Sequence, residues 1–366
     1  MKQIFEVTIK HFLSYEFVYI FLFCSLISLI FAMFVQKKIL KIIGIIIFAM
    51  FFVLSLIEFL LSLFMPIPQL EFHKNYLKKI HNYNTVSRRE IELFDNKKGK
   101  YFCNTIISEK FLNQNKSKII FDVNYTTFEN GFRYTECNVK SKTSYVFLGC
   151  SFVLGLGLED DETLPYYFSK INGFNNNILN CGYPGLSTTT AVNILENDII
   201  DTFIKNSQIK YFFYSFIPDH IYRNFRIESN SMCIDSCKYQ NNKWIRIQQP
   251  FGKFKVLFAR SYIFRKVFLV RIDEYNKQFY EDYMISNLME INKIIEEKYK
   301  SKFIIVAWPG AEQKFIEKLK TKLDVIVLTE YFNPREEKYS IPIDGHPSAE
   351  ANKTIAKILY NHIQNN

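Results

Sequence analysis

The chain has 366 residues, of which 48% are hydrophobic, and a formal net charge of +10. This length accommodates one mid-sized domain with additional segments. The lysines and arginines are scattered and no recognised nucleic-acid module is present, so the positive charge does not indicate binding to DNA or RNA. A basic surface close to anionic lipid headgroups accounts for the same charge.

The N-terminal fifth of the chain is almost entirely apolar. Residues 17–35 carry no charge, and these nineteen residues are enough to cross a hydrocarbon core of about 30 Å as a helix. A second apolar run, 42–65, has Glu58 as its single charge and ends at Pro66. A cleaved signal peptide is the alternative for the first run, but there is no small-residue cleavage site and another apolar run follows at once. We therefore expect residues 1–68 to form a hairpin of two transmembrane helices in the membrane lipid bilayer.

The connection between the two apolar runs, residues 36–41, contains three lysines. The positive-inside rule places such a loop in the cytoplasm, so the rest of the chain would lie on the extracytoplasmic side of the inner (plasma) membrane. Glu58 has two interpretations. It is either a functional intramembrane carboxylate or, as its position near the helix end favours, a group at the interface or paired within the hairpin.

The cysteines do not form a recognisable metal site. There are seven, none in a CxxC pair with histidines, so no zinc centre is expected. Cys24 lies in an apolar run and is expected to be a small buried hydrophobe. Cys233 and Cys237 either form a local disulfide in an oxidising compartment or remain thiols, and the sequence leaves both open.

Residues 69–143 are mixed and charged, and they lack a clear hydrophobic period. Their clearest feature is Asn130-Gly131, a dipeptide favoured in tight hairpin turns, which lies between two alternating segments. We expect this region to be a spacer that ends in a β-hairpin packed on the main domain.

From residue 144 onward, short apolar runs alternate with helical stretches, which predicts a doubly wound α/β domain with a central parallel sheet over 144–366. Functional sites in such sheets form at the carboxyl ends of the strands. A long insertion, about 223–281, is predicted to contain a hairpin at Asn241-Asn242 and a helix at 257–269. The predicted strands are 145–148, 177–180, 211–214, 303–307 and 325–328, and the predicted helices include 189–203, 283–298 and 347–363.

The first predicted strand runs into Gly149-Cys150-Ser151. Ser151 would stand at the carboxyl edge of the sheet, where a serine hydroxyl can act as a nucleophile and its own backbone N–H can stabilise an oxyanion. The same kind of turn also occurs without any catalytic role, so it indicates chemistry only together with a base.

A candidate base lies in the segment Asp344-Gly345-His346-Pro347. Pro347 suits the first position of a helix, which makes His346 the expected N-cap. Asp344 can reach one imidazole nitrogen of His346 and fix its tautomer, so that the other nitrogen serves as a general base. The alternative is a capping turn with an incidental histidine.

The second predicted strand ends in Asn180-Cys181-Gly182. Gly182 has no side chain to obstruct its backbone N–H, which makes it a candidate donor to a developing oxyanion. The alternative is a plain glycine turn.

The order of these motifs, from the nucleophile turn through a glycine to Asp-His before the last helix, resembles the SGNH (GDSL-like) hydrolase family over residues 145–363. Segments 158–165 and 185–187 are also similar to that family. The resemblance implies an α/β fold of the SGNH or flavodoxin-like type with about five strands and no metal or organic cofactor. It also implies Ser151 as nucleophile, His346 as base, Asp344 as its orienting group, and an oxyanion hole that includes Ser151 and Gly182.

The sequence departs from the family pattern at three places. Cys150 stands where the family usually has aspartate, and one residue separates Asp344 from His346 where two are commoner. The Gly-x-Asn-Asp motif is missing after the third strand. His220 is our expected third oxyanion donor, with Asn224 as the alternative, and a buried structural role for His220 stays open.

These features together predict a serine-dependent ester hydrolase that acts through an acyl-serine intermediate on an acylated, first of all O-acetylated, envelope glycan or lipid. An O-acyltransferase to a cell-surface sugar would use the same triad. A non-catalytic glycan-binding or assembly protein that retains the fold is the alternative from another class, because the third motif is incomplete.

Overall fold

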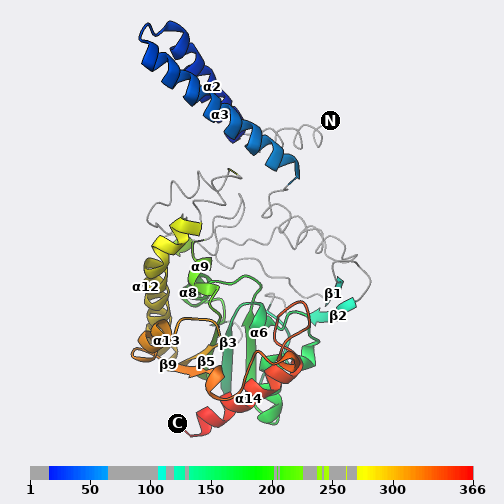
Figure 1. Ribbon diagram of the computed structural model, residues 1–366. Coiled ribbons are helices and arrows are strands. Elements are labelled where there is room, and N and C mark those ends of the chain that lie inside the picture. The colour runs from blue at the N-terminus through cyan, green and yellow to red at the C-terminus, as the bar shows by residue number, and fades with distance from the viewer. Residues whose placement is uncertain are drawn as a thin grey trace. The chain divides into compact units, whose positions relative to one another are not determined.

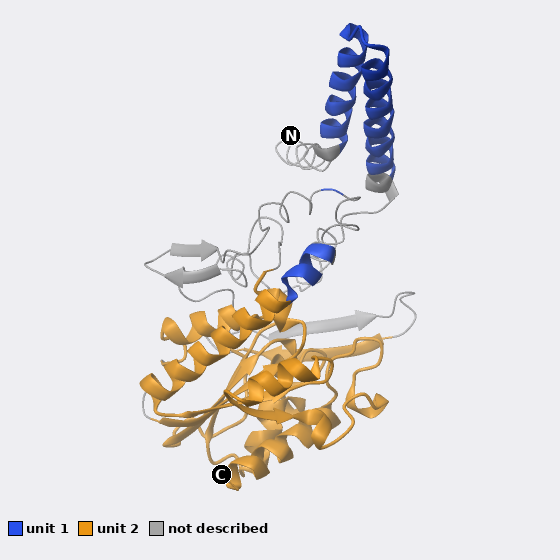
Figure 2. Ribbon diagram, turned by 60° about the vertical axis from the view of Figure 1, so that its left-hand side comes forward, with its two compact units in different colours: residues 1–77, 227–230, 248–277 blue, residues 78–226, 231–247, 278–366 orange. Residues whose placement is uncertain are grey.

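The structure, a computed structural model, describes residues 16–64, 106–112, 119–127, 132–201, 204, 207–225, 237–240, 243–246, 261 and 270–365. Its contacts divide the chain into two compact units. One consists of residues 1–77, 227–230 and 248–277, and the other contains the rest of the chain (Figure 2). The expected boundary at residue 143 does not coincide with a break between the units, because residues 78–226 all belong to the second one.

The first unit contains two helices that pack side by side, α2 (Glu16–Phe34) and α3 (Lys38–Phe64) (Figure 1). Gly44 lets the two backbones approach closely, because a Cβ there would lie 2.9 Å from the Cβ of Ala32. The hydroxyl of Ser25 donates to the carbonyl of Phe48 at 3.2 Å across the pair. These small and polar contacts are the kind that hold helices together where no water drives association.

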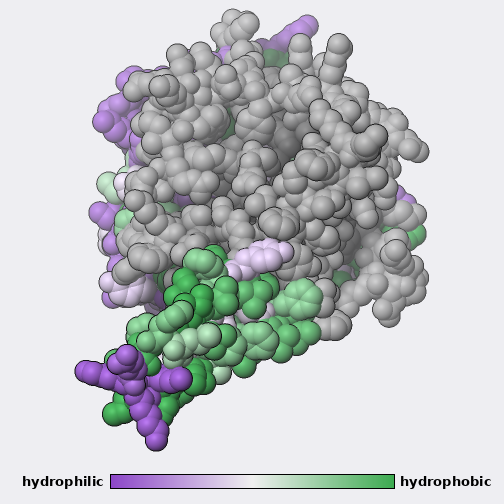
Figure 3. Space-filling view, turned by 90° about the horizontal axis from the view of Figure 1, so that it is seen from above, coloured by the Kyte–Doolittle hydropathy of each residue, from purple (hydrophilic) through white to green (hydrophobic). Residues whose placement is uncertain are grey.

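The outward side chains of this helical pair are almost all apolar (Figure 3). Residues 38–60 are long and apolar enough to cross a membrane, whereas 18–34 form a shorter apolar helix. Glu58 is only 2% exposed and accepts a hydrogen bond of 3.1 Å from the hydroxyl of Ser261. A partner of Glu58 therefore comes from the insertion, 203 residues further along the chain.

The second unit is built on a sheet of five parallel strands in the order β4-β3-β5-β8-β9. Each predicted apolar run lies in or against one of these strands, and the α/β parallel architecture is confirmed. Numbered along the chain, the order is 2-1-3-4-5, that of a doubly wound sheet whose ligands bind at the switch between the first and third strands. The strands are β3 (Thr143–Gly149), β4 (Asn177–Gly182), β5 (Gln208–Phe216), β8 (Lys302–Ala307) and β9 (Asp324–Val327).

Helices cover the sheet in two groups. Helices α7 and α14 pack on one another, and Asn287 of α12 donates to the hydroxyls of Thr188 and Thr189 in α8 (Figure 1). Their bounds are α6 (Ser151–Leu154), α7 (Leu164–Ile171), α8 (Thr188–Glu196), α9 (His220–Arg223), α12 (Val270–Ile294), continued by a π-turn over Ile295–Tyr299, α13 (Gln313–Lys320) and α14 (Ala349–Gln364).

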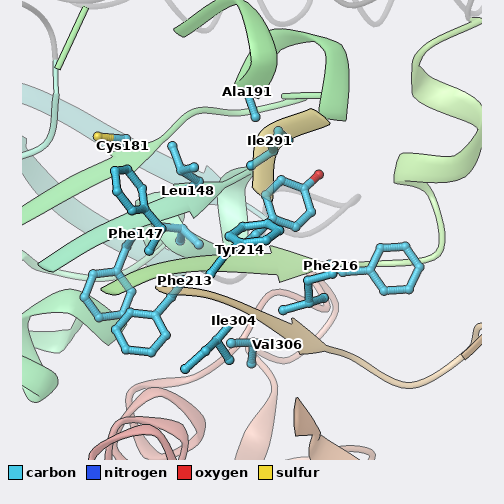
Figure 4. Close-up of a cluster of buried hydrophobic side chains, with 14 of the residues drawn as sticks. Phe147, Leu148, Cys181, Ala191, Phe213, Tyr214, Phe216, Ile291, Ile304 and Val306 are labelled. Carbon is cyan, nitrogen blue, oxygen red and sulfur yellow. The ribbon is translucent and has the colours of Figure 1, made fainter. Parts of the chain in front are cut away.

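The central strands are buried on both faces, which is why they appear in the sequence as continuous apolar runs. On one face, the rings of Phe147 and Phe213 lie 4.9 Å apart, and Phe168 of α7 packs against both at 5.3 and 5.4 Å. Leu148 and Tyr214 alternate with them on the same strands (Figure 4). Each aromatic pair stabilises the fold by about 0.5–1.5 kcal/mol beyond the effect of its buried area. The carboxyl ends of the strands therefore extend from a rigid core.

The segment before the sheet contains more structure than a spacer. Strands β1 (Ile106–Leu112) and β2 (Ile119–Thr126) pair antiparallel, and Thr127 forms an antiparallel bridge with Arg133 across the predicted hairpin. Arg133 in turn bridges Asn180 at the edge of the sheet. The turn at 128–131 lies outside the described residues.

In the insertion, strands β6 (Cys237–Gln240) and β7 (Lys243–Arg246) form the predicted hairpin around 241–242. The turn residues 241–242, Cys233 and the predicted helix at 257–269, apart from Ser261, lie outside the described residues.

The last helix begins two residues later than predicted. Ser348 is its N-cap, and the Ser348 hydroxyl accepts from the N–H of Ala351 at 3.3 Å. The expectation that His346 is the N-cap is wrong, because the N–H of Ile341 donates to the carbonyl of His346 at 2.7 Å and Pro347 bridges Ser340. The segment 340–347 is therefore a closed loop of its own before the helix.

Gly182 is the tightest point between the sheet and α6. A Cβ at this position would lie 2.2 Å from the backbone nitrogen of Leu154 and 2.7 Å from the carbonyl carbon of Val153, and backbone atoms cannot give way as a side chain does. We expect Gly182→Ala to lower the free energy of unfolding by about 3 kcal/mol or more, the upper end of the cost of overpacking. Urea denaturation of the full chain in detergent measures it.

Gly173→Ala is the matched control. Gly173 has a left-handed φ of +64° and only the Asn175 side chain nearby, so its substitution costs the conformational strain of roughly 1–2 kcal/mol. Equal losses for the two variants would mean that the contact between Gly182 and α6 is looser than the structure has it.

Candidate active site

Ser151 begins the one-turn helix α6 at the carboxyl end of β3 and is 6% exposed. The helix ends at Gly155, whose left-handed φ of 78° lets the chain turn back at once. Because the first N–H groups of a helix have no partner inside it, the backbone N–H of Ser151 is oriented to donate outward, next to its own hydroxyl. The predicted position of the candidate nucleophile, at the start of the element after the first strand, agrees with the structure.

His346 brings the two ends of the domain together. Its Nε2 lies 2.8 Å from the Oγ of Ser151, 195 residues away in sequence, and its Nδ1 lies 2.5 Å from the Oδ2 of Asp344. With the proton on Nδ1 donated to the Asp344 carboxylate, Nε2 is left to accept the Ser151 proton. The single residue between Asp344 and His346 suffices, because Gly345 adopts a left-handed φ of 81° that folds the carboxylate back onto the ring.

One aromatic ring, Phe152, packs on the imidazole of His346, and a second, Trp308, packs on Phe152. The ring of Phe152 meets His346 edge-on at 5.4 Å and Trp308 edge-on at 4.9 Å. Trp308 is held in turn, because its indole N–H donates to the hydroxyl of Ser215 at 3.0 Å. These contacts limit rotation of the His346 ring, so the base keeps its direction towards Ser151.

The predicted oxyanion role of Gly182 needs correction. Its N–H already donates to the Oδ1 of Asn180 at 3.0 Å, and the Asn180 amide donates to the carbonyl of Val153 at 3.1 Å. The absence of a side chain at Gly182 serves the close approach of α6 described above. It does not leave a backbone donor open to a substrate.

A second glycine lies closer to open space. Gly185 has a left-handed φ of 81°, and among the described residues no atom other than those of its chain neighbours lies within 4 Å of where its Cβ would be. It occupies a turn in which the N–H of Leu186 donates to the carbonyl of Tyr183 at 3.1 Å. The backbone N–H of Tyr183 donates to the carbonyl of Gly149, so this turn runs alongside the nucleophile turn. Pro184-Gly185 is the signature of a type II turn and was the signal in the sequence that could have indicated it.

His220 and Asn224, the two candidates for a third donor, are both fully buried. The Nδ1 of His220 lies 2.8 Å from the hydroxyl of Tyr214, and its ring packs between Tyr214 and Phe216. The Oδ1 of Asn224 accepts hydrogen bonds from the backbone and hydroxyl of Thr189, which ties α9 to α8. Neither side chain presents a surface that a substrate carbonyl can reach in this structure.

Arg223 is the residue near the nucleophile that sequence analysis missed. Its Nε donates to Asp219 at 2.8 Å, its Nη1 donates to the carbonyl of Leu186 at 3.2 Å, and its guanidinium interacts electrostatically with the side chain of Cys150. Burial lowers the pKa of Arg223, but Cys150 and Asp219 raise it by more, so its pKa lies above the ordinary value. The only signal in the sequence was the Asp219–Arg223 pair at helical spacing.

The two cysteines beside the site are both buried and free. Burial raises the pKa of the Cys181 thiol, which makes it a poor nucleophile because the thiolate is the reactive form. Cys150 has no exposed surface, and it interacts electrostatically with the Arg223 guanidinium.

Comparison with known proteins gives only distant similarities. No family model matches the chain, and no curated protein matches it. A lipase from a goat rumen metagenome is 14% identical with a TM-score of 0.38, and the match covers 60% of this chain and 96% of that chain. The esterase AlinE4, described as an SGNH-hydrolase family esterase, is 13% identical with a TM-score of 0.34, over 62% of this chain and 96% of that one. At this distance their activities do not transfer to this chain.

We expect His220→Ala to act on stability. The substitution removes a buried ring and leaves the Tyr214 hydroxyl without this partner, so the free energy of unfolding should fall by about 1–3 kcal/mol. The turnover of the folded fraction should stay within a few-fold of the wild-type value. Thermal denaturation and ester turnover of the same preparation measure the two effects.

Tyr214→Phe is the matched control, since it removes the same hydrogen bond and keeps both rings. A folded His220→Ala protein that loses turnover by about 10²–10³, while Tyr214→Phe keeps it, would instead make His220 the third oxyanion donor.

Proposed function

We propose that the chain is a serine-dependent ester hydrolase that works through an acyl-serine intermediate. The observation that carries this proposal is the continuous hydrogen-bonded chain from Ser151 Oγ through His346 to Asp344. A nucleophile in contact with a base, which is itself oriented by a third group, is the arrangement by which triads are recognised whatever their fold. It weighs against a non-catalytic protein that only retains the fold.

In the first half of the reaction, Ser151 Oγ attacks the ester carbonyl while His346 Nε2 takes its proton. The tetrahedral intermediate collapses as the protonated His346 gives that proton to the departing alcohol oxygen, which leaves the acyl group on Ser151. In the second half, His346 deprotonates a water molecule that attacks the acyl carbon. Collapse releases the carboxylic acid and returns the proton to Ser151. Asp344 holds the ring and stabilises its positive charge throughout.

The negative charge that develops on the carbonyl oxygen needs donors. We assign this role to the backbone N–H groups of Ser151 and Gly185 and to the guanidinium of Arg223. The open space at Gly185 supports its role, because the N–H of Gly182 is already engaged. Arg223 is favoured over His220, because it is 8% exposed and its Nη1 donates to the carbonyl of Leu186 in the turn that contains Gly185. Each such donor contributes about 2.7–4 kcal/mol to transition-state stabilisation.

The substrate that we propose is an acylated, first of all O-acetylated, glycan or lipid of the cell envelope. Support comes from the apolar helical pair, whose residues 38–60 can span a bilayer and would hold the enzyme at a membrane. Transfer of the acyl group to a sugar hydroxyl uses the same acyl-serine, and it differs from hydrolysis only in which acceptor reaches the intermediate. Adding a soluble sugar acceptor to the ester assay separates the two, since a transferase forms the acylated sugar in place of free acid.

Ser151 is the residue whose removal should abolish the activity. We expect Ser151→Ala to lower turnover of an activated acetyl ester by about 10³-fold or more, as loss of a triad member does. A fluorophosphonate should label the wild-type protein at Ser151 and fail to label the variant, as peptide mass spectrometry can show.

Cys150→Ala provides the adjacent control, and it should keep turnover within about tenfold, because Cys150 contacts Arg223 and not the triad. Turnover lost in Cys150→Ala and kept in Ser151→Ala would identify a cysteine enzyme instead.

The orientation in the membrane follows from the loop between α2 and α3. Lys37, Lys38 and Lys41 lie in or next to this connection, and the positive-inside rule places it in the cytoplasm. An alkaline phosphatase fused after Gln69 should therefore be active, and a fluorescent protein fused at the same place and exported in unfolded form should be dark. The opposite pattern would put the catalytic unit in the cytoplasm and remove the argument for an envelope substrate.

A further inference from the structure

Arg133 is a fully buried cation that lies outside the triad. Its Nη1 donates to the carbonyls of Leu154 and Gly155, and its Nη2 donates to the carbonyl of Leu158, all at 2.7 Å. Its Nε pairs with Asp160 at 2.9 Å. One side chain from the segment before the sheet thus binds four points of the loop that follows the nucleophile.

The carbonyls that Arg133 binds are close to Ser151 in the hydrogen-bond network. Leu154 and Gly155 end the single turn of α6, and the carbonyl of Ser151 accepts from the N–H groups of Gly155 and Leu156 at 3.0 Å. A helix of one turn has little stability of its own. The position of Ser151 therefore depends on what holds the end of that turn, and Arg133 holds it.

Strand β2 reinforces the same loop with further polar contacts. The hydroxyl of Tyr125 accepts from the N–H of Gly157 at 2.8 Å, and the Asp160 carboxylate accepts from the N–H of Thr126 at 3.2 Å. The guanidinium of Arg133 stacks over the Tyr125 ring at 4.5 Å. The loop 154–160 is consequently tied along its length to β2 and Arg133.

The same strand also packs against the loop that carries the base. Phe121 and Tyr125 of β2 share a small buried cluster with Leu158 of the nucleophile loop and Ile341 of the loop 340–347. Ile341 is bonded to the base loop at both ends, since its N–H donates to the carbonyl of His346 and its own carbonyl accepts from Gly345. The strand β2 is thus in contact with both loops that meet at the hydrogen bond between Ser151 and His346.

The chemistry of Arg133 suits a role in positioning the loop 154–160 better than a role in filling space in the core. A buried guanidinium carries a desolvation cost of several kcal/mol, and an apolar side chain of similar volume is often neutral or stabilising in its place. Three carbonyls at fixed angles, however, need a planar, forked donor, which only arginine supplies.

We propose that Arg133, supported by Tyr125 and Asp160, is a positioning residue that sets the distance between Ser151 Oγ and His346 Nε2. This inference rests on the proposed function of the triad.

The test uses the full-length protein in detergent, with p-nitrophenyl acetate as substrate. Arg133→Met keeps the volume and removes every donor, and it should lower kcat by about 10²-fold with KM within about threefold, because misplacement by an ångström costs that much. Arg133→Lys keeps the positive charge but lacks the planar, forked set of donors. Its kcat should lie between those of the wild type and Arg133→Met. The rate of fluorophosphonate labelling of Ser151 should fall in the same order.

Lys298→Met is the control for Arg133→Met, because it too removes a cation that binds carbonyl and carboxylate oxygens. Lys298 contacts the carbonyl of Leu195 and the carboxylates of Asp198 and Asp201, away from both catalytic loops. It should lower the melting temperature and leave kcat unchanged. Tyr125→Phe removes only a hydroxyl and should still fold, so it tests the proposal even where Arg133→Met does not fold. Its kcat should fall by about three- to tenfold.

The outcomes separate the two proposals. If Ser151→Ala keeps full turnover, the proposed function itself fails. If Ser151→Ala is inactive while Tyr125→Phe and the folded Arg133 variants keep the wild-type kcat, the triad stands and the positioning role is overturned. A loss of kcat in Lys298→Met as large as that in the Arg133 variants, at equal loss of stability, would also overturn it, because turnover would then follow stability alone.

Discussion

The hydrogen bond of 2.8 Å between His346 Nε2 and Ser151 Oγ places the strictest demand on this fold. A parallel sheet brings the carboxyl ends of its strands to one edge, and this places the two loops in the same region. It does not fix them to the fraction of an ångström that proton transfer needs. Helix α6 has one turn, and the loop 340–347 closes on itself through Ile341 and His346. Neither element is rigid alone, so the contact depends on side chains that hold the loops from outside.

Those side chains come from two directions. Phe152 contacts the imidazole ring from within the sheet domain and is backed by Trp308, whose indole is anchored on Ser215 of β5. Arg133 holds the end of α6 from the segment that precedes the sheet. Arg223 donates to the carbonyl of Leu186 and interacts electrostatically with the side chain of Cys150 in the turn that begins α6. Its positive charge lies beside the place where negative charge would develop in the proposed reaction.

The sheet and the three residues of the candidate triad could be predicted because their physical signals are local. Strands buried on both faces appear as uninterrupted apolar runs, and the residue after each run has to lie at the sheet edge. The Asp344-x-His346 spacing could also be interpreted locally, because Gly345 permits the left-handed backbone that brings carboxylate and ring together. The N-cap was misplaced by two residues, since the bridge between Ser340 and Pro347 is a contact that no local pattern reveals.

The oxyanion donors were harder to predict, because an N–H group can bind an oxyanion only when it does not already donate to another acceptor. The sequence shows that Gly182 lacks a side chain, but its N–H is engaged because the Asn180 side-chain oxygen, two residues earlier in the strand, accepts from it. His220 stands at the predicted position after β5, and its burial follows from Tyr214 and Phe216 on the strand before it. In both cases the residue type and place were predictable, and the tertiary partner that decides the role was not.

Arg133 shows the same limit in its strongest form. In the sequence it stands in a mixed, charged stretch, where an arginine is expected on the surface. Its burial requires four groups from a loop more than twenty residues away, and the Tyr125 ring of β2, to converge on one guanidinium. The apolar cluster of β2 gives contact area without direction, whereas the hydrogen bonds of Arg133 have fixed angles. The buried apolar area holds β2 against the domain. The angles of the Arg133 hydrogen bonds fix the position of the far end of the loop that begins at Ser151. The segment that looked like a spacer therefore belongs to the catalytic unit, because the most directional contacts to the nucleophile loop come from it.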